Sequence, residues 1–358
     1  MNLKKASPEK YDIIIVGGGP AGLKCAHVLS GSDKRVLLLE KAPVFGDKLC
    51  AGGLTANDLK ILDVPDSVIE HKISNTSLQS PKRISTTQAP RPFLYTVNRK
   101  ALGSWQRSLL DKTHMVVRNN TQVTRIGKDH IELAGGERIY YTFLVGADGY
   151  NSIVRKFLGL PVQKKLIGIQ YTIPWNIVDP TLEIHLDSKL FKAWYAWIFP
   201  HQDSIAVGCC SDPGVLPPAK LKQNFQTWLD KKGIDYTGFK LQTYPISYDY
   251  RGIHFGNIFL IGEAAGMASG LTGEGIYQSL VSGLEAAHMI LDPDHVPEQL
   301  HKVIHYNAVQ HKIMSLFKRS HFIRNFLHEL LLMVMNNQRV KSFIRRSFSP
   351  EGTPVPDQ

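Results

Sequence analysis

Residues 11–22 read YDIIIVGGGPAG, and this stretch predicts the fold of the N-terminal part of the chain. Four apolar residues form a short buried strand, and a helical run to about Leu29 follows three glycines in G-x-G-x-x-G spacing. The first glycine permits a tight turn, the second lets a pyrophosphate approach the backbone, and the third lets the helix pack closely on the strand. Free N–H groups at a helix N-terminus bind phosphate. The predicted diphosphate contacts are Gly17, Gly19, Pro20, Ala21 and Gly22.

A second apolar strand, RVLLLE, ends at Glu40, 23 residues after Gly17. A carboxylate at that distance accepts hydrogen bonds from ribose hydroxyls. Strand, glycines, helix, strand and acid follow one another in this order, which a chance glycine-rich turn would not produce. We therefore predict a dinucleotide site that includes Glu40 and the adjacent Lys41.

Two later segments indicate which dinucleotide is bound. In residues 143–159 a buried strand leads to Asp148 and then to a helix. In residues 257–283 another buried strand leads to Glu263, a glycine-rich loop and a helix of small residues. A cofactor with a long ribityl chain needs this second acid and second helix N-terminus, whereas NAD does not. The additional predicted cofactor contacts are Asp148, Gly262, Glu263, Gly273, Gly275 and Ile276.

These three segments together resemble the FAD-binding pattern of the flavoprotein monooxygenase and geranylgeranyl reductase superfamily, from about residue 10 to residue 300. Within it, three pieces resemble the geranylgeranyl reductase family: KLCAGGL (48–54), YAWIFP (195–200) and LTGEGI (271–276). The chain departs from the family pattern at Glu263, where Asp is usual, and at residues 192–194, where Lys-Ala-Trp replaces Pro-Gly-Gly.

The resemblance implies an α/β fold, with a Rossmann-like FAD-binding domain of the glutathione-reductase and aromatic-hydroxylase type. This domain is expected to comprise residues 1–75, 98–160 and 250–295. An antiparallel-sheet substrate domain is expected from residues 76–97 and 161–249, and a basic helical tail from residues 296–358.

The resemblance also implies roles for particular residues. Arg99, which opens a helix capped by Asn98, is expected to face the flavin, and Val123 is expected to contact adenine through its backbone. The expected catalytic residues are Cys50, Gly52 and Gly53. The aromatic residues expected to line a lipid-accepting cavity are Tyr195, Trp197 and Phe199.

Composition sets the remaining limits. The 358 residues are 43% apolar and 20% charged, as in globular proteins. There is no secretory h-region and no long apolar run. Four scattered cysteines indicate a reducing, cytoplasmic setting. The 14 histidines include no H-x-x-x-H pair with a third ligand nearby in sequence, so no metal site is expected.

Residues 301–347 of the tail carry +8 of the net charge of +11. Residues 301–347 contain nine Lys or Arg against the single acid Glu329. Apolar residues recur there at helical spacing, so one helix face is apolar. Such a helix could bind an anionic membrane surface, on the inner face of the membrane, or it could dock on the enzyme's own core. Nucleic acid is not an expected partner, because no recognition motif is present.

The sequence thus predicts an FAD-dependent oxidoreductase that reduces isolated double bonds of a prenyl lipid. No second G-x-G-x-x-G follows a strand, so electrons are expected from transiently bound NAD(P)H, a small redox protein or a quinol. Two alternatives stay open: a flavin-dependent aromatic hydroxylase, and a non-catalytic FAD-binding accessory protein of lipid-carrier metabolism.

Overall fold

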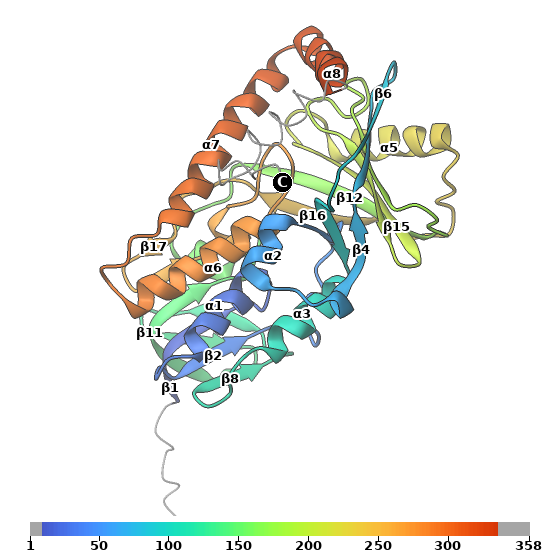
Figure 1. Ribbon diagram of the computed structural model, residues 1–358. Coiled ribbons are helices and arrows are strands. Elements are labelled where there is room, and N and C mark those ends of the chain that lie inside the picture. The colour runs from blue at the N-terminus through green and yellow to red at the C-terminus, as the bar shows by residue number, and fades with distance from the viewer. Residues whose placement is uncertain (1–8, 336–358) are drawn as a thin grey trace, which may run out of the picture.

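The computed structural model describes residues 9–335 and contains two large sheets (Figure 1). The first is built on parallel strands, because short apolar runs buried on both faces suit a parallel sheet covered by helices. Its strand order is β17 (His254–Phe255), β18 (Ile258–Leu260), β11 (Arg138–Gly146), β1 (Lys10–Val16), β2 (Val36–Leu39) and β8 (Met115–Arg118). Two antiparallel strands extend β11: β10 (His130–Leu133) and β9 (Val123–Ile126).

Small residues allow two helices to pack tightly over this sheet. These are α1 (Pro20–Ser30) and α6 (Ile276–Leu291). A Cβ at Gly283 of α6 would overlap the Ala21 carbonyl, so glycine sets the close approach. The shorter helical elements are α2 (Ala56–Leu62), η1 (Asp66–Val68), α3 (Arg99–Ser108), α4 (Ile153–Phe157) and η2 (Gly262–Ala265).

The second sheet has seven strands and an apolar face covered by α5 (Pro218–Lys232), which buries Phe225 and Trp228. Its pairs are antiparallel except β13–β5. The strand order is β16 (Gln242–Ser247), β12 (Lys165–Pro174), β15 (Ser204–Ser211), β14 (Ala196–His201), β13 (Thr181–His185), β5 (Asn75–Gln79) and β6 (Ile84–Gln88). The predicted fold class is confirmed.

A small third sheet draws strands from both predicted domains. It consists of β3 (Gly53–Thr55), β7 (Leu94–Val97) and β4 (Ile69–Ile73). Strand β3 directly follows the segment that contains Cys50. This sheet therefore holds the predicted catalytic loop between the two large sheets.

Two C-terminal helices complete the described chain: α7 (Glu298–Arg319) and α8 (His321–Met335). Helix α7 runs from α6 towards the second sheet, and α8 lies near β6 (Figure 1). Lys318 pairs with Asp212 at 2.5 Å, and Arg83 of the β5–β6 turn pairs with Glu329 at 3.2 Å. The described part of the tail therefore docks on the protein's own core. Within residues 9–335 no helix is long and apolar enough to cross a membrane.

Candidate functional site

In the glycine turn after β1, close packing leaves no room for a side chain except at one position. Gly17 has φ +110°, and a Cβ there would overlap the Ala147 carbonyl. A Cβ at Gly22 would overlap the Gly17 carbonyl, which shows how closely α1 approaches the strand. At Gly19 a Cβ would meet nothing within 4 Å. The backbone is thus open at the glycine predicted to admit a pyrophosphate, beside Pro20 and Ala21 of the first turn of α1.

The acid at the end of β2 lies against this turn. The Glu40 carboxylate accepts hydrogen bonds from the backbone N–H of Gly18 at 2.6 Å and of Ala42 at 2.8 Å. These bonds orient Glu40 towards the glycine turn. Lys41 is exposed, and the Val123 side chain is buried in the core, which leaves its backbone as the part able to contact a ligand.

A polar cleft of about 280 Å³ lies between the second sheet, the loop of Cys50 and the start of α3. Arg99 lines it, and its Nε and Nη1 atoms are buried without a partner among the described residues. The Oε1 atoms of Gln170 and Gln242, which also line the cleft, are likewise buried and unpartnered. Buried polar groups are normally hydrogen-bonded, so three such groups around one cleft indicate that a polar ligand completes the site.

The second acid lies where β18 ends. Glu263 accepts a hydrogen bond from the Ser247 N–H at 3.0 Å, and its other oxygen pairs with Lys48. Lys48 is half exposed and comes from the loop of Cys50, so this ion pair connects that loop to the end of β18 in the first sheet.

Asp148 forms a hydrogen bond at the N-terminus of the nearby helix α4. One of its oxygens accepts the Ile153 N–H at 2.6 Å at the start of α4, while Oδ1 is buried without a partner among the described residues. Burial raises the pKa of this carboxyl.

The remaining predicted loop residues belong to the turn after β18 and to the start of α6. Gly262 (φ +57°) packs on Ala21, where a Cβ would lie 2.9 Å from the Ala21 Cβ. Gly273 has φ +71°, Gly275 caps α6, and Ile276 is its first residue.

The loop of Cys50 is shaped by two side chains of β14. A Cβ at Gly52 would lie 2.7 Å from Cε1 of His201, and one at Gly53 would lie 2.6 Å from Cε1 of Phe199. Both glycines are therefore required by packing. Cys50 itself is half exposed and lines the polar cleft, and its Sγ lies 3.5 Å from the Gly52 N–H.

The sequence interpretation missed a pair that holds this loop. Nδ1 of His201 is hydrogen-bonded to Glu70, and Nε2 lies 3.0 Å from the Ala51 carbonyl oxygen. The two ring nitrogens of His201 therefore each face an oxygen atom, one from Glu70 and one from the Ala51 backbone. His201 directly follows the YAWIFP motif, and this adjacency was a signal in the sequence that could have identified it. Glu70 lies 131 residues away with no local signal.

An apolar cavity of about 610 Å³ lies between the second sheet and helices α7 and α8. Apart from Tyr195, Thr272 and His328 its walls are aliphatic or aromatic: Leu78, Ile184, Leu186, Ala193, Leu271, Ile313, Phe317, Leu327, Leu330, Leu331 and Val334. Burial, with the nearby Arg324 charge, lowers the pKa of His328 to about 4. The ring is therefore neutral at pH 7.

The three predicted substrate aromatics have different positions. Tyr195 lines the cavity, and its hydroxyl donates to the carbonyl of Thr272 in the LTGEGI loop. Trp197 is buried and packs edge-on against Tyr195, with ring centres 6.0 Å apart. Phe199 packs on the loop of Cys50 at Gly53. Only Tyr195 of the three is among the residues that form the cavity wall.

Comparison with known proteins identifies the family. Residues 10–215 match the family described as FAD binding domain. The chain belongs to this FAD-binding family. It is 26% identical over 304 residues to a geranylgeranyl diphosphate reductase of Rhodobacter capsulatus, which covers 78% of this chain and 74% of the relative. The resemblance to geranylgeranyl reductases is thus confirmed.

Solved structures agree on the fold. A geranylgeranyl bacteriochlorophyll reductase-like protein of Thermoplasma acidophilum superposes with a TM-score of 0.71 at 22% identity, covering 96% of this chain and 92% of that one. A p-nitrophenol 4-monooxygenase of Pseudomonas putida superposes with a TM-score of 0.72 at 15% identity, covering 96% and 99%. The fold is therefore shared with a reductase-like protein and with a monooxygenase.

The cofactor of this FAD-dependent oxidoreductase is FAD, and the residues present fit it. The open backbone at Gly19 suits the diphosphate, and Glu40 lies beside the glycine turn, a position that suits its predicted role as ribose acceptor. The unpartnered nitrogens of Arg99 suit the oxygens of the flavin or its phosphate.

Proposed function

We propose that the protein reduces isolated carbon–carbon double bonds of a prenyl lipid. The observation that carries this proposal is the apolar cavity, which begins at the LTGEGI loop and ends among the apolar side chains of α8. Pockets for small polar aromatics contain several convergent polar groups that fix orientation. Here the Tyr195 hydroxyl is already used by Thr272, and the rest of the wall is almost entirely hydrocarbon. A long, branched hydrocarbon chain suits such a wall.

FAD, when bound, supplies the hydride for such a reduction. The other alkene carbon needs a proton, and we propose that the Cys50 thiol delivers it. Cys50 lines the polar cleft, while the next residue, Ala51, packs in the apolar cluster that includes Tyr195 and Leu271. The loop therefore lies between a polar space that can resupply protons and an apolar space that excludes water.

The His201–Glu70 pair keeps the loop in this position. It binds the Ala51 carbonyl from the side of the cleft, and the glycines at 52 and 53 let His201 and Phe199 approach. We infer that His201 acts as a positioning residue. The electron donor, NAD(P)H or a small redox protein, is proposed to bind transiently.

We also propose that the outer face of α8 contacts an anionic membrane surface, where a prenyl lipid resides. Phe322, Phe326 and Met333 are 81%, 58% and 55% exposed, and their spacing places them on one side of the helix. The basic residues 339–346 that would contribute charge lie outside the described residues. Sedimentation with vesicles that contain anionic lipid, compared with neutral vesicles and raised salt, tests this contact.

The function is tested in a single turnover. Enzyme reduced in the absence of oxygen is mixed with prenyl diphosphates of increasing length, and flavin reoxidation and product mass are recorded. We expect reoxidation together with a product heavier by two hydrogens for each reduced bond. Oxygen uptake coupled to hydroxylation of an aromatic compound would instead support the hydroxylase. Bound FAD without turnover on any prenyl lipid would support the accessory protein.

A variant of the cavity wall sharpens the test. Leu331→Trp places a larger ring in the cavity, whereas Phe322→Trp makes a similar change on the exposed face of α8. Displacing one five-carbon unit of substrate costs about 4 kcal/mol at about 0.8 kcal/mol per buried CH₂, or about a thousandfold in kcat/KM for long chains. Short chains should be affected less. Equal losses for both chain lengths would show that the cavity does not hold the prenyl chain.

A further inference from the structure

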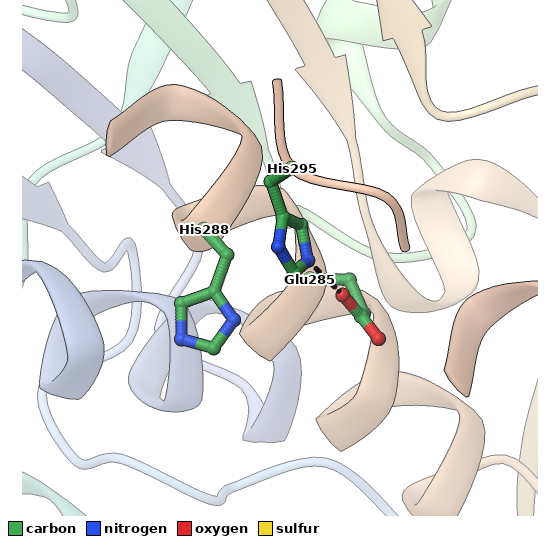
Figure 2. Close-up of side chains that lie close together, drawn as sticks. All are labelled: Glu285, His288 and His295. Atoms are coloured by element: carbon green, nitrogen blue, oxygen red, sulfur yellow. Dashed lines mark hydrogen bonds and ion pairs between the residues drawn. The ribbon is translucent and has the colours of Figure 1, made fainter. Parts of the chain in front are cut away.

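Three potential metal ligands converge at the corner between α6 and α7 (Figure 2). Glu285 and His288 lie three residues apart near the end of α6, so they share one face of the helix. His295 comes from the turn before α7. One ligand atom from each residue lies within 4.8 Å of the other two.

The side chains are already ordered for a shared ligand. Glu285 is only 3% exposed, and it accepts the Gln299 N–H at 3.0 Å through Oε1. Its other oxygen lies 2.5 Å from Nε2 of His295. The rings of His288 and His295 meet edge to face, with centres 5.0 Å apart. No hydrogen bond joins the His288 ring to another residue within the described chain, so its nitrogens are available.

We propose that Glu285, His288 and His295 bind one divalent transition-metal ion of the Zn²⁺ type. Two imidazoles and one carboxylate suit zinc, cobalt or nickel, whereas magnesium and calcium prefer an all-oxygen shell. His288 and His295 are half exposed, so water completes the coordination. The ion takes the place of the hydrogen-bond proton between Nε2 of His295 and Glu285, and a neutral His295 ring then carries its proton on Nδ1.

The geometry requires only small movements. Zinc-to-ligand distances of about 2.0–2.2 Å in a tetrahedron put neighbouring ligand atoms about 3.3 Å apart. The distance between Nε2 of His295 and the Glu285 oxygen must therefore increase by about 0.8 Å. The ligand nitrogen of His288 must move closer to the other two ligand atoms by up to about 1.5 Å. Side-chain torsions can supply both changes, because the two rings are partly in solvent.

The site would clamp two functional helices. Helix α6 starts at the LTGEGI loop, and α7 carries Ile313 and Phe317 of the cavity wall. A metal at their junction would stabilise this wall without contacting cofactor or substrate. The sequence interpretation expected no metal because it sought histidines four residues apart. The ligands here are Glu-x-x-His followed by a histidine seven residues later.

The test uses tag-free, FAD-loaded protein that has been dialysed against a chelator. We expect ZnCl₂ to bind at one ion per chain by calorimetry and to raise the thermal midpoint. CoCl₂ should give the visible absorption of a site that is not octahedral, and MgCl₂ should produce neither effect. Because the flavin absorbs in the visible range, the cobalt spectrum is taken as a difference from metal-free protein.

The variants His288→Ala and His295→Ala should weaken zinc binding by more than about tenfold, as losses at zinc sites commonly do. His305→Ala, which removes an exposed histidine of α7 outside the cluster, should bind as the parent protein does. Glu285→Gln tests the carboxylate. Because the Glu285 side chain is buried, this variant could fail to fold, and in that case the two histidine variants provide the test. Zinc binding that is absent, or equally tight in both histidine variants, overturns the proposal.

Discussion

Arg99 offers a prediction in which one substitution has opposite effects on the free and the FAD-bound protein. Its Nε and Nη1 atoms are buried in the polar cleft without a partner among the described residues. Each buried donor left unsatisfied costs about 1–3 kcal/mol. The residue as a whole is half buried, so the lower end applies. Arg99→Met should therefore stabilise the FAD-free protein by about 1–2 kcal/mol.

The same substitution should weaken FAD binding. A hydrogen bond to a charged group contributes about 1.5–3 kcal/mol, so the dissociation constant should rise about 10- to 150-fold. Asp58 gives a second readout. Burial raises the pKa of its carboxyl to about 6, and the Arg99 charge opposes that rise. Without Arg99, the pKa of Asp58 should move further upward.

The assay combines urea unfolding of the FAD-free protein with fluorescence titration by FAD. Arg91→Met is the matched control, because Arg91 is exposed and outside the cleft. An unchanged FAD dissociation constant would refute the placement of Arg99 at the cofactor. Loss of stability in the FAD-free variant would refute the claim that its buried nitrogens are unsatisfied.

Other predictions follow from the same geometry. Glu40→Ala should raise the FAD dissociation constant about 10- to 150-fold, and an unchanged titration would contradict its ribose role. Cys50→Ala should leave the flavin spectrum intact but slow flavin reoxidation by a prenyl lipid about 10²–10⁴-fold. His201→Ala should slow the same step. Reoxidation at the wild-type rate in either variant would show that the substituted residue only contributes to packing. Burial, with Asp58 nearby, raises the pKa of Glu274 from 4.5 to about 7. The folded state then holds the extra proton, so stability should fall as pH rises from about 4.5 to 7, and Glu274→Gln should flatten that decline in urea unfolding.

Several features of the site were predictable because their signals are local in sequence. The glycine turn, the following helix and Glu40 lie within one β-α-β unit, where residue spacing fixes position. Asn98 at the start of α3 follows the same logic, since its side chain accepts the N–H groups two and three residues later. The alternating stretches between residues 163 and 211 likewise predicted an antiparallel sheet.

The tail marks the limit of this reasoning. Its apolar periodicity showed that one helix face avoids water, but periodicity does not name the surface that covers it. The tertiary structure sets α7 and α8 against the second sheet, so Phe317 and Leu331 become walls of a cavity. The basic residues beyond position 335 lie outside the described chain, and the membrane contact stays a prediction.

Contacts between distant residues were decided by the tertiary structure alone. Lys48 and Glu263 pair across 215 residues, and His201 reaches Glu70 across 131. The site therefore depends on both local and long-range features of the chain. Local backbone geometry, which the glycine spacing dictates, predicts where the cofactor binds. The packing of the two sheets and the C-terminal helices decided what surrounds the reacting atoms, because those neighbours meet only when elements far apart in sequence bury their apolar faces together.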